Sequence, residues 1–146
     1  MEIVTSGVEN ARELDAVIDS VAAEGIYLAH DTGFGEQETR KFIEYCLRGG
    51  YPQLLAIEDG RIVGWCDVVP GARRSRGCLG LGVLKEYRGR GFGKQLLAAA
   101  LAAGFRVFRS IELSVRADNA RAIALYRAFG FCQYRPLMPQ RTQSRG

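Results

Sequence analysis

The chain of 146 residues is 47% hydrophobic and 25% charged, with a net charge of +4, which is typical of one globular domain with a sizeable core. No apolar run approaches the roughly 20 residues of a membrane span, and the N-terminal residues lack the layout of a signal peptide, so we expect a cytoplasmic protein without a membrane partner. The four cysteines are widely spaced and form no CxxC pair, which predicts reduced, buried thiols and no bound metal.

Hydrophobic periodicity and turn residues predict a single domain over residues 1–135, with elements in the order β-α-α-β-β-β-α-β-α-β. Asp59-Gly60 joins two apolar runs, which is the signature of an antiparallel hairpin. Residues 136–146 are rich in Pro, Gln and Arg, and we expect a tail or an edge strand there. The predicted strands are 2–5, 53–57, 61–69, 78–84, 110–116 and 131–134; the predicted helices run from a cap at Ser6 or Asn10 to 23, over 36–47 and 94–103, and from a cap at Asp118 or Asn119 to 129.

The two halves of the chain carry opposite charge. Residues 1–72 hold five Lys or Arg and thirteen Asp or Glu, whereas residues 73–146 hold fifteen and three. The basic half suits a polyanionic ligand, and the acidic half favours a cationic partner. The arginines are scattered among strand, loop and helix signals and do not line one recognition helix, which argues against a nucleic-acid partner.

The most informative stretch is an apolar strand, a glycine-rich loop and a helix over residues 80–97. N–H groups at the start of a helix have no intrahelical partner and carry partial positive charge. Three glycines, at positions 89, 91 and 93, leave these N–H groups open to a ligand. Arg88, Arg90 and Lys94 add formal charge. The stretch therefore predicts a site for a phosphate or pyrophosphate, and a basic turn without a ligand is the alternative.

Two other phosphate-binding motifs do not fit this loop. A P-loop would need a glycine at Arg88 and a Ser or Thr at Gln95. A dinucleotide fingerprint that begins at Gly89 would need a glycine at Lys94. The pattern Arg88-x-x-Gly91-x-Gly93 after an apolar strand instead resembles the acyl-CoA-binding signature of the GNAT N-acetyltransferases.

A second stretch carries the same resemblance. Residues 119–131 are similar to the late GNAT motif Asn-x-x-Ala-x-x-Leu-Tyr-x-x-x-Gly-Phe, with Asn119, Tyr126 and Phe131 at its marked positions. The order of predicted elements matches as well, so the resemblance covers about residues 2–134. It implies an α+β fold, with a mixed, mostly antiparallel central sheet of about six or seven strands, helices on both faces and a splay between strands four and five.

The resemblance implies acetyl-CoA as co-substrate, with its pantetheine between the two splayed strands and its pyrophosphate on the glycine-rich loop. Glycines at 80 and 82 suit a strand bulge or a close ligand, and plain close packing is the alternative for Gly82. The N–H group of Val83 is the candidate donor to the thioester oxygen. The cofactor-binding residues implied are Leu81, Gly82, Val83, Arg88, Gly89, Arg90, Gly91, Phe92, Gly93, Lys94, Asn119 and Tyr126.

The implied reaction moves an acetyl group to a primary amine of a small molecule or peptide by direct attack in a ternary complex. Tyr126 is the implied general acid, although it also lies on the core-facing stripe of its helix. The general base stays open between Glu112, Asp67 and a water molecule. Ser114 stands where some family members carry a Glu, so the match to the branch that acetylates ribosomal-protein N-termini is incomplete.

The implied acceptor pocket is walled by the loop between the first two helices, with Tyr27, Leu28, His30, Asp31 and Phe34. We leave a homodimer open, because homodimers are common in the family. The absence of a carboxylate on strand four also keeps an alternative open: a non-catalytic CoA-binding sensor, or a basic RNA-associated module, on the same fold.

Overall fold

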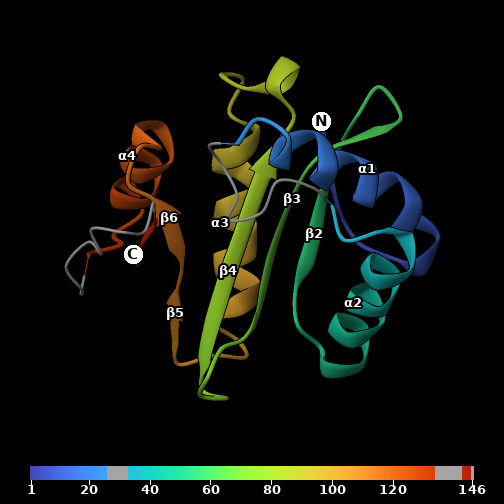
Figure 1. The fold of residues 1–146 in the computed structure, drawn as a ribbon. Coiled ribbons are helices and arrows are strands. Elements are labelled where there is room, and N and C mark those ends of the chain that lie inside the picture. The colour runs from blue at the N-terminus through green and yellow to red at the C-terminus, as the bar shows by residue number, and fades with distance from the viewer. Residues whose placement is uncertain (26–32, 134–142, 146) are drawn as a thin grey trace.

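The computed structural model describes residues 1–25, 33–133 and 143–145. Its centre is a five-stranded sheet in the order β1-β2-β3-β4-β5 (Figure 1). The first four strands pair antiparallel, and β5 pairs parallel with β4. The strands are β1 (Glu2–Thr5), β2 (Gln53–Glu58), β3 (Arg61–Pro70), β4 (Arg76–Val83) and β5 (Ser110–Glu112).

Helices cover both faces of this sheet. The helices α1 (Ala11–Ala22) and α2 (Glu36–Gly49) pack together on one face, and α3 (Phe92–Gly104) packs on the other against β3. The apolar stripe predicted for the first helix is confirmed, because Leu14, Val17, Ile18 and Val21 are buried. The fourth helix, α4 (Ala120–Ala128), stands beyond β5 (Figure 1). None of the helices in the described part of the chain is long and apolar enough to span a bilayer.

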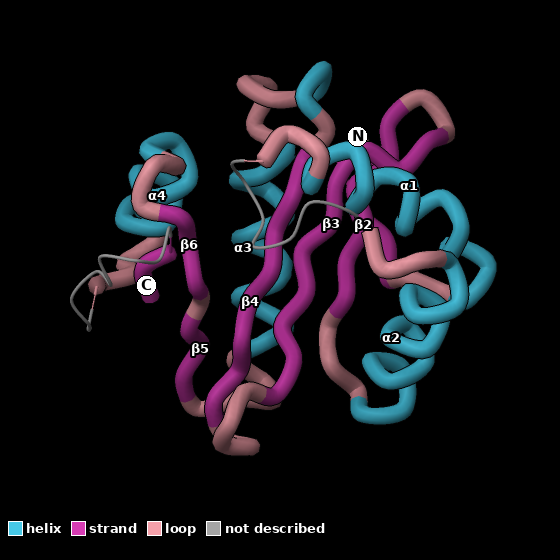
Figure 2. Tube along the Cα trace, in the orientation of Figure 1, coloured by secondary structure: helices cyan, strands magenta, loops and turns pink. Residues whose placement is uncertain are grey.

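The strands of the sheet diverge between β4 and the residues that follow β5. Only Arg76–Cys78 of β4 pairs with β5, so 79–83 have no strand partner on that edge within the described residues. The next strand, β6 (Ser114–Arg116), pairs instead with β7 (Gln143–Arg145) in a separate two-stranded sheet. Figure 2 shows β6 continuing from β5 after a short break and diverging from β4. The mixed α+β fold with its splay between strands four and five is thereby confirmed.

Three predicted details are wrong. The strand expected over 110–116 is broken at Leu113, and its two halves belong to different sheets. Residues 131–133 form no strand, and position 134 lies outside the described residues. The glycines of β4 form no bulge with β3, since the register runs without a shift from Gly64–Val83 to Pro70–Gly77. Gly82 lies opposite Trp65, and a Cβ atom at Gly82 would overlap the indole ring, so close packing requires this glycine.

Candidate active site

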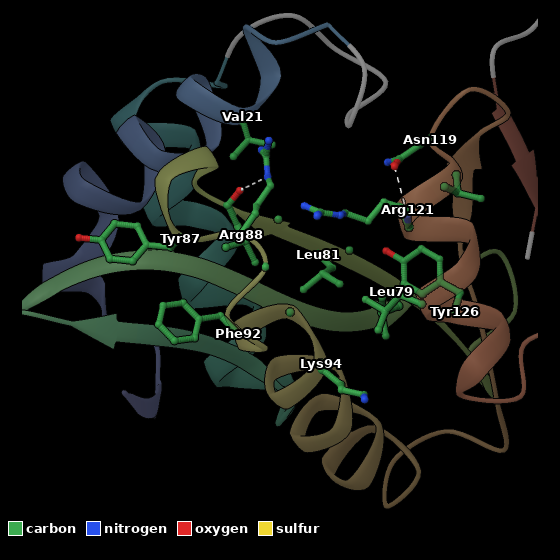
Figure 3. A pocket seen from close by; sticks show the side chains of 18 of the residues that line it. Val21, Leu79, Leu81, Tyr87, Arg88, Phe92, Lys94, Asn119, Arg121 and Tyr126 are labelled. Atoms are coloured by element: carbon green, nitrogen blue, oxygen red, sulfur yellow. Dashed lines mark hydrogen bonds between the residues drawn. The ribbon is translucent and has the colours of Figure 1, made fainter.

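The diverging strands enclose a cavity of about 540 Å³, which we call the interstrand cleft (Figure 3). One wall is the unpaired half of β4, the opposite wall is β6 with α4, and the glycine-rich loop lies at one end. The cleft brings together every predicted cofactor-binding residue except Arg90. Its lining consists of Val21, 79–83, 87–89, 91–94, 114–116, Asn119, Arg121, Ala122, Leu125 and Tyr126.

The glycine-rich loop presents main-chain N–H groups to the cleft. Gly89 and Gly91 have φ angles of 78° and 85°, a conformation that residues with a side chain rarely adopt. The first hydrogen bond at the start of α3 runs from Gln95 N–H to the Gly91 carbonyl at 3.1 Å. The N–H groups of residues 92–94 precede this bond and therefore have no partner within the helix. This arrangement fits a phosphate group.

Arg88 does not supply the positive charge that its sequence position suggests. Its Nη1 and Nη2 atoms donate to the two carboxylate oxygens of Glu24 at 2.7 and 2.6 Å, and its Nε donates to the Val83 carbonyl at 3.0 Å. The hydrogen bond from Arg88 lowers the pKa of Glu24. Arg88 therefore fastens the end of α1 to the end of β4, and its charge is largely neutralised.

The positive charge in the cleft comes from other side chains. Arg90 is not one of them: its guanidinium carbon lies 5.1 Å from the centre of the Tyr87 ring, on which Phe92 also stacks at 5.9 Å. Lys94 lines the cleft, and Arg121 extends from α4 into it (Figure 3). Neither cation has a carboxylate partner among the described residues.

The sequence prediction missed Arg121. A signal for it exists, because Arg121 lies in the first turn of α4, where the helix dipole disfavours a cation. A bound anion would offset the unfavourable position of this arginine.

Asn119 and Tyr126 reach the cleft from α4 and its cap. The Asn119 Oδ1 atom accepts the Ala122 N–H at 3.2 Å and caps the helix, so only its Nδ2 atom remains to donate to a ligand. Tyr126 is 8% exposed, and its hydroxyl points into the cleft (Figure 3). Burial raises the pKa of Tyr126, which keeps this hydroxyl protonated. The ring packs edge-on against Phe131, so Tyr126 serves the core and the cleft together.

Glu112, the first candidate for the general base, lies elsewhere. It is paired in register with Cys78, before the two strands diverge, and its Oε2 atom is 3.7 Å from Arg76 Nη1. It lines a separate cavity of about 270 Å³ near Gly130 and does not line the interstrand cleft. The assignment of Glu112 assumed one continuous strand over 110–116, and the break at Leu113 removes that premise.

A second cavity of about 540 Å³ lies between the sheet and the helices α1 and α2, and we call it the helix-side cavity. It shares Gly80 and Leu81 with the interstrand cleft. Of the predicted acceptor-pocket residues, Phe34 lines it, whereas Tyr27, Leu28, His30 and Asp31 lie outside the described residues. The full lining is Ile18, Phe34, Glu38, Thr39, Phe42, Gln53, Trp65, Asp67, Gly80 and Leu81.

Asp67 is the buried carboxyl group of the helix-side cavity. It lies on β3 opposite Gly80, is 9% exposed, and has a pKa that burial raises to about 7. Gln53 opposes this rise by donating from Nε2 to Asp67 Oδ2 at 3.4 Å. The Ser6 hydroxyl donates to Gln53 Oε1 at 2.7 Å and so orients the amide. Within the described residues, no cluster of His, Cys, Asp and Glu could hold a metal ion.

The sheet diverges next to the N-terminus of α3, where the free N–H groups can hold a phosphate. The resemblance to GNAT N-acetyltransferases implies this same arrangement. The model of the acetyltransferase (GNAT) family matches residues 17–131. The chain belongs to this family.

Two curated relatives match part of the chain. N-alpha-acetyltransferase 30 of Schizosaccharomyces pombe is 32% identical over 88 residues, which make up 57% of this chain and 59% of that protein. An uncharacterized protein of Mycobacterium leprae is 53% identical over 45 residues, which make up 31% of this chain and 12% of that protein. The chain therefore spans less than two thirds of the length of either relative.

Solved structures share the fold over nearly the whole chain. A ribosomal-protein-alanine N-acetyltransferase from Brucella melitensis has a TM-score of 0.86 at 23% identity, and the match covers 99% of this chain and 96% of that one. A phosphinothricin acetyltransferase from Sinorhizobium meliloti, in complex with acetyl-CoA, has a TM-score of 0.87 at 20% identity, and the match covers 99% and 85%. At these identities the likeness concerns the fold.

Proposed function

We propose that the protein transfers an acetyl group from acetyl-CoA to a primary amine of a small molecule or peptide, by direct attack in a ternary complex. The observation that carries this proposal is the junction of the two cavities at Gly80 and Leu81 of β4. A thioester lying along the interstrand cleft and an amine in the helix-side cavity would meet at these two residues. The family assignment and the acetyl-CoA complex of the phosphinothricin acetyltransferase support the same cofactor.

The interstrand cleft suits coenzyme A along its length. The N–H groups of 92–94 would hold the pyrophosphate, with Lys94 and Arg121 adding positive charge. The open edge of β4 at 81–83 would pair with the amides of the pantetheine in the manner of an added strand. When bound, the cofactor supplies an activated acetyl group as a thioester.

The proton transfers of the reaction fall to Asp67 and Tyr126. Asp67 would take a proton from the ammonium group, and the free amine would then attack the thioester carbonyl. A pKa of about 7 is suited to a general base at neutral pH. Tyr126 would give its proton to the sulfur as the carbon–sulfur bond breaks. The attacking nitrogen would lose its second proton as the amide forms, and this proton would restore the Tyr126 hydroxyl, so the products are an amide and a thiol. Asp67 thus takes the role first considered for Glu112.

The cysteines support direct transfer. None of the four lines the interstrand cleft. Burial raises the pKa of Cys46 to about 12 and that of Cys66 well above its usual range, so both remain thiols. Because the thiolate is the nucleophilic form of cysteine, neither is suited to carry an acyl group.

A thiol-release assay with acetyl-CoA and a panel of primary amines tests the proposal. We expect release above background hydrolysis with at least one amine, together with the acetylated product by mass spectrometry. If calorimetry shows coenzyme A binding but no amine causes thiol release, the result would contradict the proposed enzymatic activity and favour a sensor. Retention on RNA that weakens with salt, again without release, would favour the RNA-associated alternative.

A further inference from the structure

The helix-side cavity has mainly apolar walls, and this composition limits the amine it can accept. Its walls come from both covering helices and from the sheet, with Ile18, Phe34, Phe42, Trp65 and Leu81 as the apolar lining. Phe34 is 59% exposed and lies at the mouth, whereas Trp65 is buried and lies against Gly82. An amine that enters must therefore bury a carbon skeleton against these side chains.

The polar groups of the same cavity are few, and most already have partners. The Thr39 hydroxyl donates to Asp15 Oδ1 at 2.9 Å. The Gln53 amide is held between Ser6 and Asp67. Glu38 is exposed and lies 3.3 Å from Lys41 Nζ, so it belongs to the rim. Asp67 is therefore the buried group of the described lining that can receive an ammonium.

The acidic charge of the N-terminal half does not collect at this cavity. Asp15 accepts the N–H groups of 34 and 35 at 3.1 and 3.0 Å, and Asp19 accepts that of Gly33 at 2.9 Å. Glu13 accepts the Ile62 N–H at 2.8 Å, and Glu24 binds Arg88. These four carboxylates make contacts within the fold, and the acidic residues of the described cavity lining are Glu38 and Asp67.

We propose that the acceptor is a primary amine with a single cationic group on an apolar body, and that its ammonium is presented to Asp67. This inference rests on the proposed function and names its substrate class. Apart from Asp67 and the rim residue Glu38, the described lining would offer a second ammonium mainly apolar side chains, so a polyamine or an aminoglycoside is disfavoured. Two kinds of compound combine one cationic amine with an apolar body: free alkyl or arylalkyl amines, and peptides whose first residue is apolar.

The main test compares transfer to four probes at equal concentration: 2-phenylethylamine, a lysine-free tetrapeptide amide that begins with leucine, the same peptide beginning with aspartate, and spermidine. We expect kcat/KM to be at least about tenfold higher for 2-phenylethylamine, the leucine peptide or both than for the other two. A comparison of 2-phenylethylamine with the leucine peptide shows whether the acceptor is a small amine or a peptide N-terminus. Preference for spermidine or for the aspartate peptide would overturn the inference and leave the transferase activity intact.

A pair of variants on one helix checks that the cavity sets the preference. Phe42→Ala removes an apolar wall and should lower kcat/KM for the preferred apolar amine roughly tenfold, with the KM for acetyl-CoA unchanged. Tyr45→Ala is the control, since the Tyr45 ring lies 6.2 Å from that of Phe42 but does not line the cavity. Equal activity of the Phe42→Ala and wild-type proteins would overturn the inference.

Binding can be followed without any transfer. Trp65 is the single tryptophan of the chain and lines the helix-side cavity, so its fluorescence reports occupancy. With coenzyme A present, 2-phenylethylamine should change this fluorescence saturably, and spermidine should not. A saturable change without acetyl transfer would contradict the proposed function, but it would support the inference that the cavity binds a single amine on an apolar body. No change with any of the four probes would overturn the inference.

Discussion

Replacement of Asp67 by Asn separates the chemical role of this residue from its structural cost. Burial raises the pKa of Asp67 from 3.8 to about 7, and the Gln53 hydrogen bond opposes the rise. The unfolded chain ionises this carboxyl near pH 4, and the folded chain does so only near pH 7. Between these values folding binds a proton, so the stability of the wild-type protein falls as the pH rises from about 4 to about 7 and then levels off.

The size of this effect follows from the same pKa values. At about 1.36 kcal/mol per pKa unit, the full difference corresponds to roughly 4 kcal/mol. Relaxation and water penetration should reduce the measured value to on the order of 1–3 kcal/mol. The Asn side chain carries no ionisable group and can still accept the Gln53 Nε2 hydrogen bond. Asp67→Asn should therefore gain stability relative to wild type as the pH increases, and should match it most closely near pH 4.

Activity should change in the opposite direction. Wild-type kcat/KM should rise with pH through about 7, as Asp67 becomes able to take a proton. Asp67→Asn should lower kcat/KM by about 10²- to 10⁴-fold and remove this rise. The assays are urea unfolding at a series of pH values and thiol release over the same series.

Two results would refute the reasoning. An Asp67→Asn variant that keeps the wild-type pH profile of kcat/KM would exclude Asp67 as the base. A constant stability difference between the variant and wild type from pH 4.5 to pH 8 would show that burial does not raise the pKa. Because the same protein carries all other titrating groups in both forms, the difference isolates Asp67.

Three further changes test the interstrand cleft. Tyr126→Phe should lower kcat by about tenfold to a thousandfold with unchanged coenzyme A affinity by calorimetry, and wild-type turnover would leave Tyr126 a core residue only. Gly91→Glu should abolish coenzyme A binding, because it adds a negative charge and places a side chain at a φ of 85°, which disfavours one. Unchanged affinity would contradict the assignment of this loop as the phosphate site. Arg121→Ala should weaken coenzyme A binding roughly tenfold, whereas Arg90→Ala should not, and the reverse order would refute the charge assignment.

Local sequence signals predicted most of the fold. The stripe of α1, the hairpin at Asp59-Gly60 and the helix after the glycine-rich loop each depend on residues close together in the chain. The same holds for the N–H groups of the loop, because a helix start exposes them whatever the rest of the fold does. These features could be predicted without knowing which strands become neighbours.

The features that the sequence did not predict depend on distant residues. Arg88 was expected to add positive charge at the loop, and its carboxylate partner Glu24 lies 64 positions earlier in the chain. The last strand was expected at 131–134, whereas β6 pairs with β7 at Gln143–Arg145. Glu112 was placed by the alternation of a continuous strand, and a break at Leu113 changes which side chains face the cleft. Pairing and strand breaks of this kind are set by tertiary contacts, which a local pattern does not encode.

The two cavities share Gly80 in their linings, and the contacts of this position give a reason for glycine there. Gly80 lies opposite Asp67, and a Cβ atom there would lie 3.2 Å from Asp67 Oδ1, closer than an ordinary van der Waals contact. A side chain at this position would cover the carboxylate on the side that faces the junction. Gly82 has a separate reason, because the Trp65 ring occupies its side-chain space. The two glycines of the strand thus have different roles. Gly80 leaves the buried carboxylate uncovered at the place where the proposed amine and thioester would meet, and Gly82 leaves room for the Trp65 ring against β4.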